Sequence, residues 1–258
     1  MNSVHVRARE IEARGFCVLP SQYTADQVKR LRAAIVAQYT ALGRPPLYSK
    51  EHKTVAENVE LSSTGLVLTK VLKKSPELHE YMLDEEVVRI AQAALGPGTH
   101  LELTGAVVTN HTRPFFDWHN HVGGIDEELF RRRGERPQLP KLQRLAMIVY
   151  LDDMKEGAGR LLVHPDRNED GSPPCVEPIG GPWPGQVVIE GPPGTTVLVD
   201  QTTWHAALPR TSDTELRIFF GLWFAAGDVG PTELHDETLR AVTGASPLLQ
   251  EILPRDTP

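Results

Sequence analysis

The amino-acid sequence predicts a mainly β fold with flanking helices, and three observations carry that prediction. Helical periodicity is confined to the N-terminal part of the chain, about residues 1–97. From there to about residue 226, apolar residues come in short runs that are separated by Gly, Pro and Asp clusters. Strands that follow one another at such short intervals are typical of a sandwich, a barrel or a jelly roll.

The N-terminal part is expected to contain one short buried strand and two helical regions. The strand is the apolar stretch GFCVLP. A helix should follow over residues 24–39, because its apolar side chains share one face and Thr24 is suited to cap its start. The second helical region is expected over residues 75–95, where Ser75 favours a helix start.

The next part, about residues 98–226, is expected to form the β core. The predicted strands lie within residues 99–110, 142–153, 159–165, 185–191, 194–201 and 216–225. The C-terminal tail, 227–258, should contain a loop and a short helix. We expect these parts to form a single domain, 1–258, because a chain of this length with 40% hydrophobic residues can bury one large core.

Charge and composition argue against several classes of protein. A formal net charge of −7 and a pI near 5.8 do not suit a protein whose partner is nucleic acid or an anionic membrane. No stretch reads as a secretory signal or approaches the ~20 apolar residues of a membrane span. The two cysteines are far apart and lack zinc-type spacing. We therefore expect a cytoplasmic protein, monomer or homodimer, whose partner is a small-molecule substrate.

A pair of histidines stands out in PFFDWHNHVGG, residues 114–124. In a strand, residues two apart project to the same face, so His119 and His121 can point at one atom. Neutral imidazole is the commonest metal ligand near neutral pH. Such a pair is weak evidence alone, because ten histidines in one chain make some close pair a matter of chance.

Two residues near the end of the core strengthen the metal hypothesis. His205 follows an apolar strand and a short polar turn, a position where side chains are exposed at a strand end. Arg217 opens the apolar run RIFFGLWFA, and burying its charge alone would be costly. Arg217 therefore needs an anionic partner, for which a carboxylate held by a bidentate fork is the natural candidate.

With these residues in view, the chain resembles the phytanoyl-CoA dioxygenase-like (PhyH) family. Four segments occur in the family's order: RGFCVLPSQYTADQVKRLRAAI, DWHNH, IVYLDDMKEGAGRLLVHPDR and GTTVLVDQTTWHAALPRTSDTELRIFFGLWF. They cover most of the chain, from about residue 10 to 226. The resemblance implies a double-stranded β-helix (jelly-roll, cupin-like) core and an oxygenase that uses Fe(II), 2-oxoglutarate as cosubstrate and O2.

The resemblance also assigns roles to individual residues. His119 matches the family's first iron ligand, His205 its distal ligand, and Arg217 the arginine that pairs with the far carboxylate of 2-oxoglutarate. Asn120 lies between the ligands, where many members carry a Gln that reaches the cosubstrate. An Asn in a turn can equally cap its own backbone.

Position 121 departs from the family pattern, because His121 stands where the family has a carboxylate ligand. The first interpretation, which we favour, is that His121 binds the metal and completes a three-histidine site. The second is that two histidines hold the metal, as in related halogenases, although a bulky imidazole would crowd a bound halide. The third is that Asp117 or Asp126 replaces the missing carboxylate.

Several other residues have weaker claims on the site. Lys70 could supply a second cation, but three lysines within five residues are more typical of a solvated segment. Asp200 is expected to hydrogen-bond within its turn, and His164 to be structural or to line a pocket. The arginines at 131–133 are more typical of a solvated helix face than of a substrate contact.

Two classes of function stay open from the sequence. One is an Fe(II)- and 2-oxoglutarate-dependent oxygenase that hydroxylates or otherwise oxidises a small molecule. The other is a jelly-roll metalloprotein with a three-histidine site that acts without 2-oxoglutarate, or an inactive binding module. Arg217 favours the first, since an abandoned cosubstrate site has no need for a buried cation, and His121 favours the second.

Overall fold

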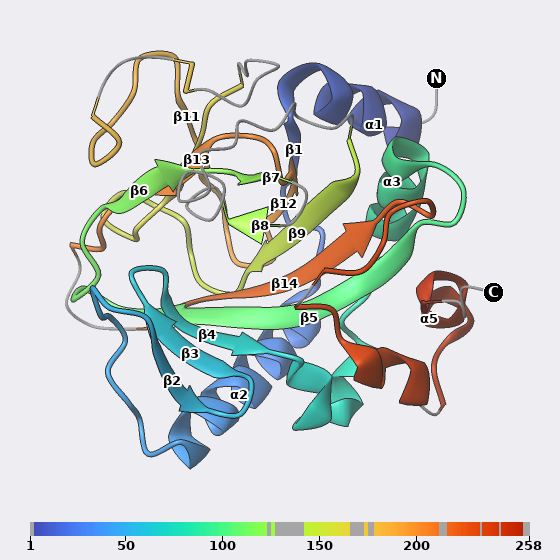
Figure 1. Cartoon of the computed structure of the whole chain (residues 1–258), viewed down its shortest axis with the longest axis horizontal. Coiled ribbons are helices and arrows are strands. Elements are labelled where there is room, and N and C mark those ends of the chain that lie inside the picture. Colours follow the sequence, from blue (N-terminus) through green and yellow to red (C-terminus); the bar gives the residue numbers. More distant parts are fainter. Residues whose placement is uncertain are drawn as a thin grey trace.

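Two antiparallel sheets form the centre of the computed structural model (Figure 1), which describes residues 3–122, 125–126, 142–165, 173–174, 178–211, 216–232, 234–242 and 244–254. The larger sheet has the strand order β1 (Phe16–Leu19), β12 (Thr196–Asp200), β9 (Arg144–Tyr150), β14 (Arg217–Ala225), β5 (His100–Thr109), β4 (Gly65–Thr69), β3 (Val59–Ser62), β2 (Lys53–Ala56). The smaller sheet has the order β11 (Val187–Val188), β10 (Leu161–Val163), β13 (His205–Ala207), β6 (Phe116–His119). A short ribbon pairs β7 (His121–Val122) with β8 (Ile125–Asp126).

Helices cover one face of the larger sheet. They are α1 (Ser3–Arg14), α2 (Ala25–Ala41), α3 (Glu85–Leu95) and α5 (Pro247–Ile252), with 3-10 turns at Val71–Lys73, Pro76–Glu80 and Glu237–Ala241. The prediction of a mainly β fold with flanking helices is confirmed. Among the described residues, no helix combines the length and apolar composition needed to cross a membrane.

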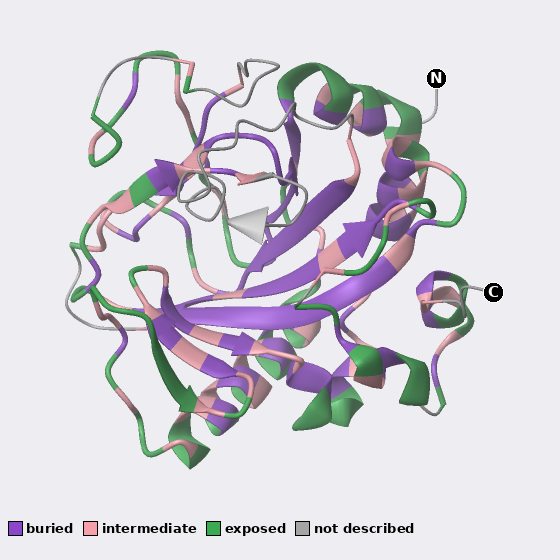
Figure 2. Ribbon diagram, in the orientation of Figure 1, coloured by how far each residue is buried: buried purple, intermediate pink, exposed green. Residues whose placement is uncertain are grey.

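The centre of the larger sheet is buried on both faces, as β9 illustrates. Every residue of RLAMIVY in β9 is buried. Leu145, Met147 and Val149 pack into the cluster that holds the helices, whereas Ala146 and Ile148 pack toward Leu161 and Val163 of the smaller sheet. This alternation follows from the two-residue period of a strand. Figure 2 shows the result as a continuous buried band along the central strands.

The first predicted helix is confirmed almost to the residue. Thr24 caps α2, and its side chain accepts from the Gln27 backbone while the Gln27 side chain accepts from the Thr24 backbone. The second predicted helical region is divided instead of continuous. It begins with a 3-10 turn after Ser75, and α3 starts only at Glu85 because Asp84 provides the capping carboxylate.

The N-terminal part is less helical than the sequence indicates, because it contains three strands, β2, β3 and β4. They form hairpins that extend the larger sheet beyond β5. The tight turns depend on Asn58 and Gly65, which both have positive φ angles. Each strand is only four or five residues long, so its apolar periodicity is too brief to distinguish from a loop.

Candidate metal centre

The structure brings together the three histidines that the sequence singled out. His119 ends β6 and lies directly opposite His205, the first residue of β13, in the antiparallel register of the smaller sheet. His121 follows two residues after His119 and turns toward the same point. One ring nitrogen from each histidine lies within 4.8 Å of those of the other two. The closest ring centres, those of His119 and His205, are 4.1 Å apart.

Backbone carbonyls fix the tautomer of two of these rings. The Nδ1 of His119 lies 2.8 Å from the carbonyl oxygen of Asp117, and the Nδ1 of His205 lies 2.8 Å from that of Thr203. A carbonyl only accepts hydrogen bonds, so each Nδ1 must carry the proton. The Nε2 atom of each ring therefore keeps its lone pair, as a metal-binding histidine requires.

The histidine cluster is held in its uncharged form. Burial lowers the pKa of all three imidazoles to about 3, and the mutual proximity of the rings acts in the same direction. At neutral pH the cluster therefore offers three unprotonated donors to a cation. Three half-buried, uncharged imidazoles, two of them with fixed tautomers, fit a divalent metal ion.

Aromatic packing holds the strands that carry these ligands. Trp118 and Trp204, each preceding a histidine of the cluster, are buried and contact Trp183, which stacks on Trp118 with ring centres 4.5 Å apart. The Trp118 indole donates to the carbonyl of Gly181. His164 packs edge-on against Trp118 and makes a 3.0 Å contact with the Pro184 carbonyl, outside the histidine cluster.

Asn120 lies between β6 and β7 and is fully buried. Its amide nitrogen donates to the carbonyl of Thr202 at 3.4 Å, while its Oδ1 has no partner among the described residues. The Asn120 side chain thus connects the His119 strand to the turn before His205. A contact with the cosubstrate stays a prediction.

Asp117, one of the two carboxylates considered as replacement ligands, is not part of the cluster. Asp117 is exposed, and the grouping of potential metal ligands among the described residues contains His119, His121 and His205 alone. Asp126 pairs with His121 through its backbone, but its side chain lies outside the described residues, as do the arginines at 131–133. Asp200 behaves as expected, since both its oxygens accept from Thr202 within the turn.

Arg217 opens β14 and is 3% exposed, which confirms the prediction of a buried arginine. Its guanidinium lies over the rings of Tyr150 and Phe219, and the Tyr150 hydroxyl is within hydrogen-bonding reach. Burial lowers the pKa of Arg217. Among the described residues it forms no ion pair, and its Nε has no acceptor.

A second buried arginine, Arg113, is a residue that the sequence reasoning missed. It lies in the loop between β5 and β6, is 2% exposed, and donates to the carbonyl of Leu208 at 2.9 Å. Burial, with the nearby charge of Arg217, lowers its pKa to about 9. Lys70, considered as a second cation, instead pairs with Glu237. The only sequence signal for Arg113 is a single basic residue before a proline, which is not specific.

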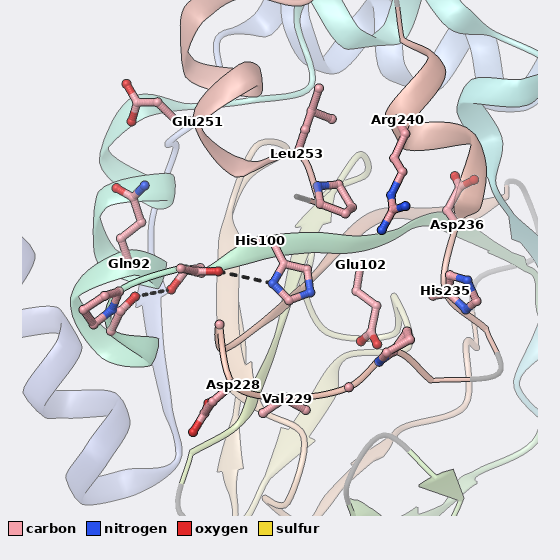
Figure 3. A pocket seen from close by; sticks show the side chains of 18 of the residues that line it. Gln92, His100, Glu102, Asp228, Val229, His235, Asp236, Arg240, Glu251 and Leu253 are labelled. Atoms are coloured by element: carbon pink, nitrogen blue, oxygen red, sulfur yellow. Dashed lines mark hydrogen bonds between the residues drawn. The ribbon is translucent and has the colours of Figure 1, made fainter. Parts of the chain in front are cut away.

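Two pockets lie at different distances from the histidines. A pocket of about 320 Å³ is lined by Tyr48, Phe115 and Phe116, and the Phe116 ring is 4.4 Å from that of His119. A larger pocket of about 1160 Å³ lies at the other end of β5, around His100 and Glu102 (Figure 3). Of these two pockets, the smaller one therefore lies beside the histidine cluster.

Comparison with known proteins gives this geometry a family context. The sequence matches the family model described as phytanoyl-CoA dioxygenase (PhyH) over residues 11–218, most of the chain. No curated protein has a sequence that matches this chain.

Solved structures share the same fold. The non-heme alpha ketoglutarate dependent carbocyclase SnoK from nogalamycin biosynthesis is 19% identical, with a TM-score of 0.65 over 96% of this chain and 93% of that one. EctD from S. alaskensis, with 2-oxoglutarate and 5-hydroxyectoine, is 18% identical, with a TM-score of 0.62 over 91% and 79% of the two chains. The epimerase SnoN, in complex with Fe3+, alpha ketoglutarate and nogalamycin RO, is 13% identical, with a TM-score of 0.61 over 87% and 84%. These similarities confirm the predicted jelly-roll core.

Proposed function

The chain belongs to the phytanoyl-CoA dioxygenase family of Fe(II)- and 2-oxoglutarate-dependent enzymes, and we propose that His119, His121 and His205 hold its iron. It is an oxidoreductase whose cofactor is Fe(II) and whose cosubstrates are 2-oxoglutarate and O2. We propose that the reaction is hydroxylation, or another oxidation, of a small molecule. The observation that carries the proposal is the convergence of three uncharged imidazoles within 4.8 Å.

Each histidine has a distinct part in this proposal. His119 and His205 present their Nε2 atoms because backbone carbonyls hold the protons on Nδ1. His121 takes the place of the usual carboxylate, so that three neutral ligands leave both positive charges of a ferrous ion uncompensated by the protein. An iron bound here would couple the oxidative decarboxylation of 2-oxoglutarate, which gives succinate and carbon dioxide, to oxidation of the substrate.

Arg217 is the residue that we assign to the cosubstrate. Its buried guanidinium has no carboxylate partner among the described residues, and a buried cation is stable only when an anion is close. The far carboxylate of 2-oxoglutarate would supply that anion. The proposal thereby favours an oxygenase over a three-histidine metalloprotein that works without 2-oxoglutarate.

The substrate would approach through the pocket beside Phe116. This pocket lies next to His119 through the Phe116 ring and is lined by Tyr48 and Phe115. Its volume of about 320 Å³ is at the small end of the range for small-molecule sites. Aromatic walls of this kind suit an apolar or ring-containing part of a small molecule.

The proposal is tested by anaerobic reconstitution with Fe(II), followed by titration with 2-oxoglutarate. The wild-type protein is expected to bind one equivalent of iron and to develop the weak visible absorption of a chelated 2-oxo acid. His205→Ala should lose the iron. Arg217→Ala should keep the iron but require far more 2-oxoglutarate to reach the same absorbance.

A matched control and one further variant define the role of His121. His164→Gln removes a buried imidazole outside the cluster and should leave iron binding intact. His121→Asp restores the carboxylate of the family pattern and should bind iron, whereas His121→Ala should bind it more weakly. A wild-type protein that shows no absorption change with 2-oxoglutarate would contradict the oxygenase and favour a metalloprotein of other chemistry.

A further inference from the structure

Two guanidinium groups are buried at the same place in the core. Arg113 donates to the carbonyl of Leu208, and a Cβ placed at Gly159 would lie 3.3 Å both from that carbonyl oxygen and from the Cδ of Arg217. Both arginines also lie close enough to Tyr150 for their charges to act on its hydroxyl. The two side chains therefore converge on one small region between β13 and β14.

No described carboxylate forms an ion pair with either arginine. The charge of Asp152 acts on Arg217, but the Asp152 carboxylate is already engaged by Arg32 and the Ile218 backbone. Arg113 Nη1 and Arg217 Nε are buried without acceptors. Two buried like charges repel, and each unpaired donor costs free energy. An anion that binds between the two groups would offset both costs.

Arg113 is also connected to the metal centre through the ring of Phe116. Its guanidinium is 5.9 Å from the centre of the Phe116 ring, and that ring is 4.4 Å from the ring of His119. An anion at the arginines is thus one aromatic ring away from the histidine cluster. This neighbourhood fits a ligand that binds the metal at one end and carries a charged group at the other.

We propose that Arg113 is a second cosubstrate-binding residue, which shares the far carboxylate of 2-oxoglutarate with Arg217. The inference rests on the proposed function and adds a residue to it. The bond from Arg113 to Leu208 fixes the guanidinium, and Nη1, which has no acceptor among the described residues, is available to donate to the ligand. Arg217 contributes its Nε, so the carboxylate accepts hydrogen bonds from two guanidinium groups whose positions are fixed.

The test compares 2-oxoglutarate with 2-oxopentanoate, which has the same 2-oxo acid group and chain but a methyl group in place of the far carboxylate. Calorimetric titration of the Fe(II)-loaded protein under argon gives both affinities without turnover. Arg113→Gln is expected to weaken 2-oxoglutarate binding about tenfold to a hundredfold, the range for hydrogen bonds to charged groups. The affinity for 2-oxopentanoate should be unchanged.

The control is Arg160→Gln. Arg160 contacts the same segment, since its carbonyl accepts from the Leu208 backbone, but its guanidinium has its own carboxylate partner in Glu190. This variant should keep the wild-type ratio of the two affinities. Arg113→Lys, which retains the charge and loses the fork, should give a ratio between those of the wild type and Arg113→Gln. If circular dichroism shows that Arg113→Gln does not fold, the affinity ratio of Arg113→Lys serves as the test in its place.

The outcomes separate this inference from the proposed function. If the wild type prefers 2-oxoglutarate and the Arg113 variants keep that preference, Arg113 has only a structural role and the inference is overturned. If the Arg113 variants bind both ligands more weakly by the same factor, the inference is also overturned. If the wild type binds neither 2-oxo acid, the proposed function fails and the inference fails with it.

Discussion

Two arginines begin neighbouring strands of the larger sheet at its opposite ends, and they differ in how they are neutralised. Arg144 starts β9 opposite Ala225, the last residue of β14, whereas Arg217 starts β14 itself. Their exposed fractions are 5% and 3%. Arg144 has a built-in partner, because its Nε and Nη2 lie 2.9 Å and 3.3 Å from the two carboxylate oxygens of Glu102. Arg217 has none among the described residues.

The comparison shows that this chain supplies a buried guanidinium with a carboxylate partner of its own where the ion pair is structural. Glu102 lies on β5, next to the site of Arg144, and it also accepts from the backbone of Thr232. At the other end of the sheet, Arg217 has Tyr150 and a second cation, Arg113, as neighbours. The first end is a structural ion pair, and we propose that the second end receives an anion from solution.

The largest expected effect is at the structural end. Glu102→Gln leaves Arg144 buried without its counter-charge, and breaking a buried pair in this way should lower the free energy of unfolding by about 3–5 kcal/mol. Urea titration followed by circular dichroism measures it. The double variant Glu102→Gln, Arg144→Met should recover much of the loss. A single variant as stable as the wild type would show that the pair is not a structural element.

The second effect concerns the end of the sheet that carries Arg217, and measuring it needs no mutation. In the iron-loaded protein under argon, 2-oxoglutarate at about 100 times its dissociation constant should raise the free energy of unfolding by about 2.7 kcal/mol, because it binds only the folded state. The measurement is the same urea titration. Adding 2-oxopentanoate at the same concentration should raise it far less, and equal shifts would argue against a carboxylate site at Arg217.

A smaller effect on the free energy of unfolding is expected when the charge of Arg217 is removed. Without 2-oxoglutarate, Arg217→Met should change the free energy of unfolding by less than about 1 kcal/mol, or raise it, since an unpaired buried cation is replaced by an apolar side chain of similar length. The variant should also lose the stabilisation by 2-oxoglutarate. A loss as large as that of Glu102→Gln would place Arg217 with Arg144 as a structural residue.

The smallest effect concerns an ion pair at the surface. Arg89 and Glu251 form a short contact that joins α3 to α5, and both side chains are exposed. Exposed pairs contribute little, because water solvates the separated charges well. Glu251→Gln should therefore leave the urea midpoint unchanged within error. A clear loss of stability would show that burial is not what distinguishes the pair of Glu102 and Arg144.

The candidate site could be predicted where residue type and position both carry information. The alternating histidines, His205 after a strand and Arg217 at a strand head are each unusual in sequence, and the structure brings the three histidines together. Arg113 could not be predicted, because its partners, Leu208 and Phe116, become visible only when the loop is folded. For the same reason Lys70 was a reasonable second cation until its contact with Glu237 was known.

The fold was predictable to a similar degree. The long central strands and the capped helix α2 have enough periodicity to identify, and both are confirmed. The strands of the hairpins β2 to β4 are too short to carry a period, and their stability comes from pairing along the sheet toward β5. The helical region predicted over residues 75–95 is divided into a 3-10 turn after Ser75 and a helix after Asp84. Tertiary contacts decide which of these two residues caps the helix.

The register that places His119 opposite His205 has a consequence for the order in which the enzyme matures. The two strands are far apart in the chain, so their pairing closes a long loop and belongs to the slow, non-local stage of folding. A slip by one residue would turn a histidine to the other face of the sheet. A chain still emerging from the ribosome lacks His205 until most of it has been synthesised, so the three-histidine cluster that we propose for iron is complete only in a nearly full-length chain.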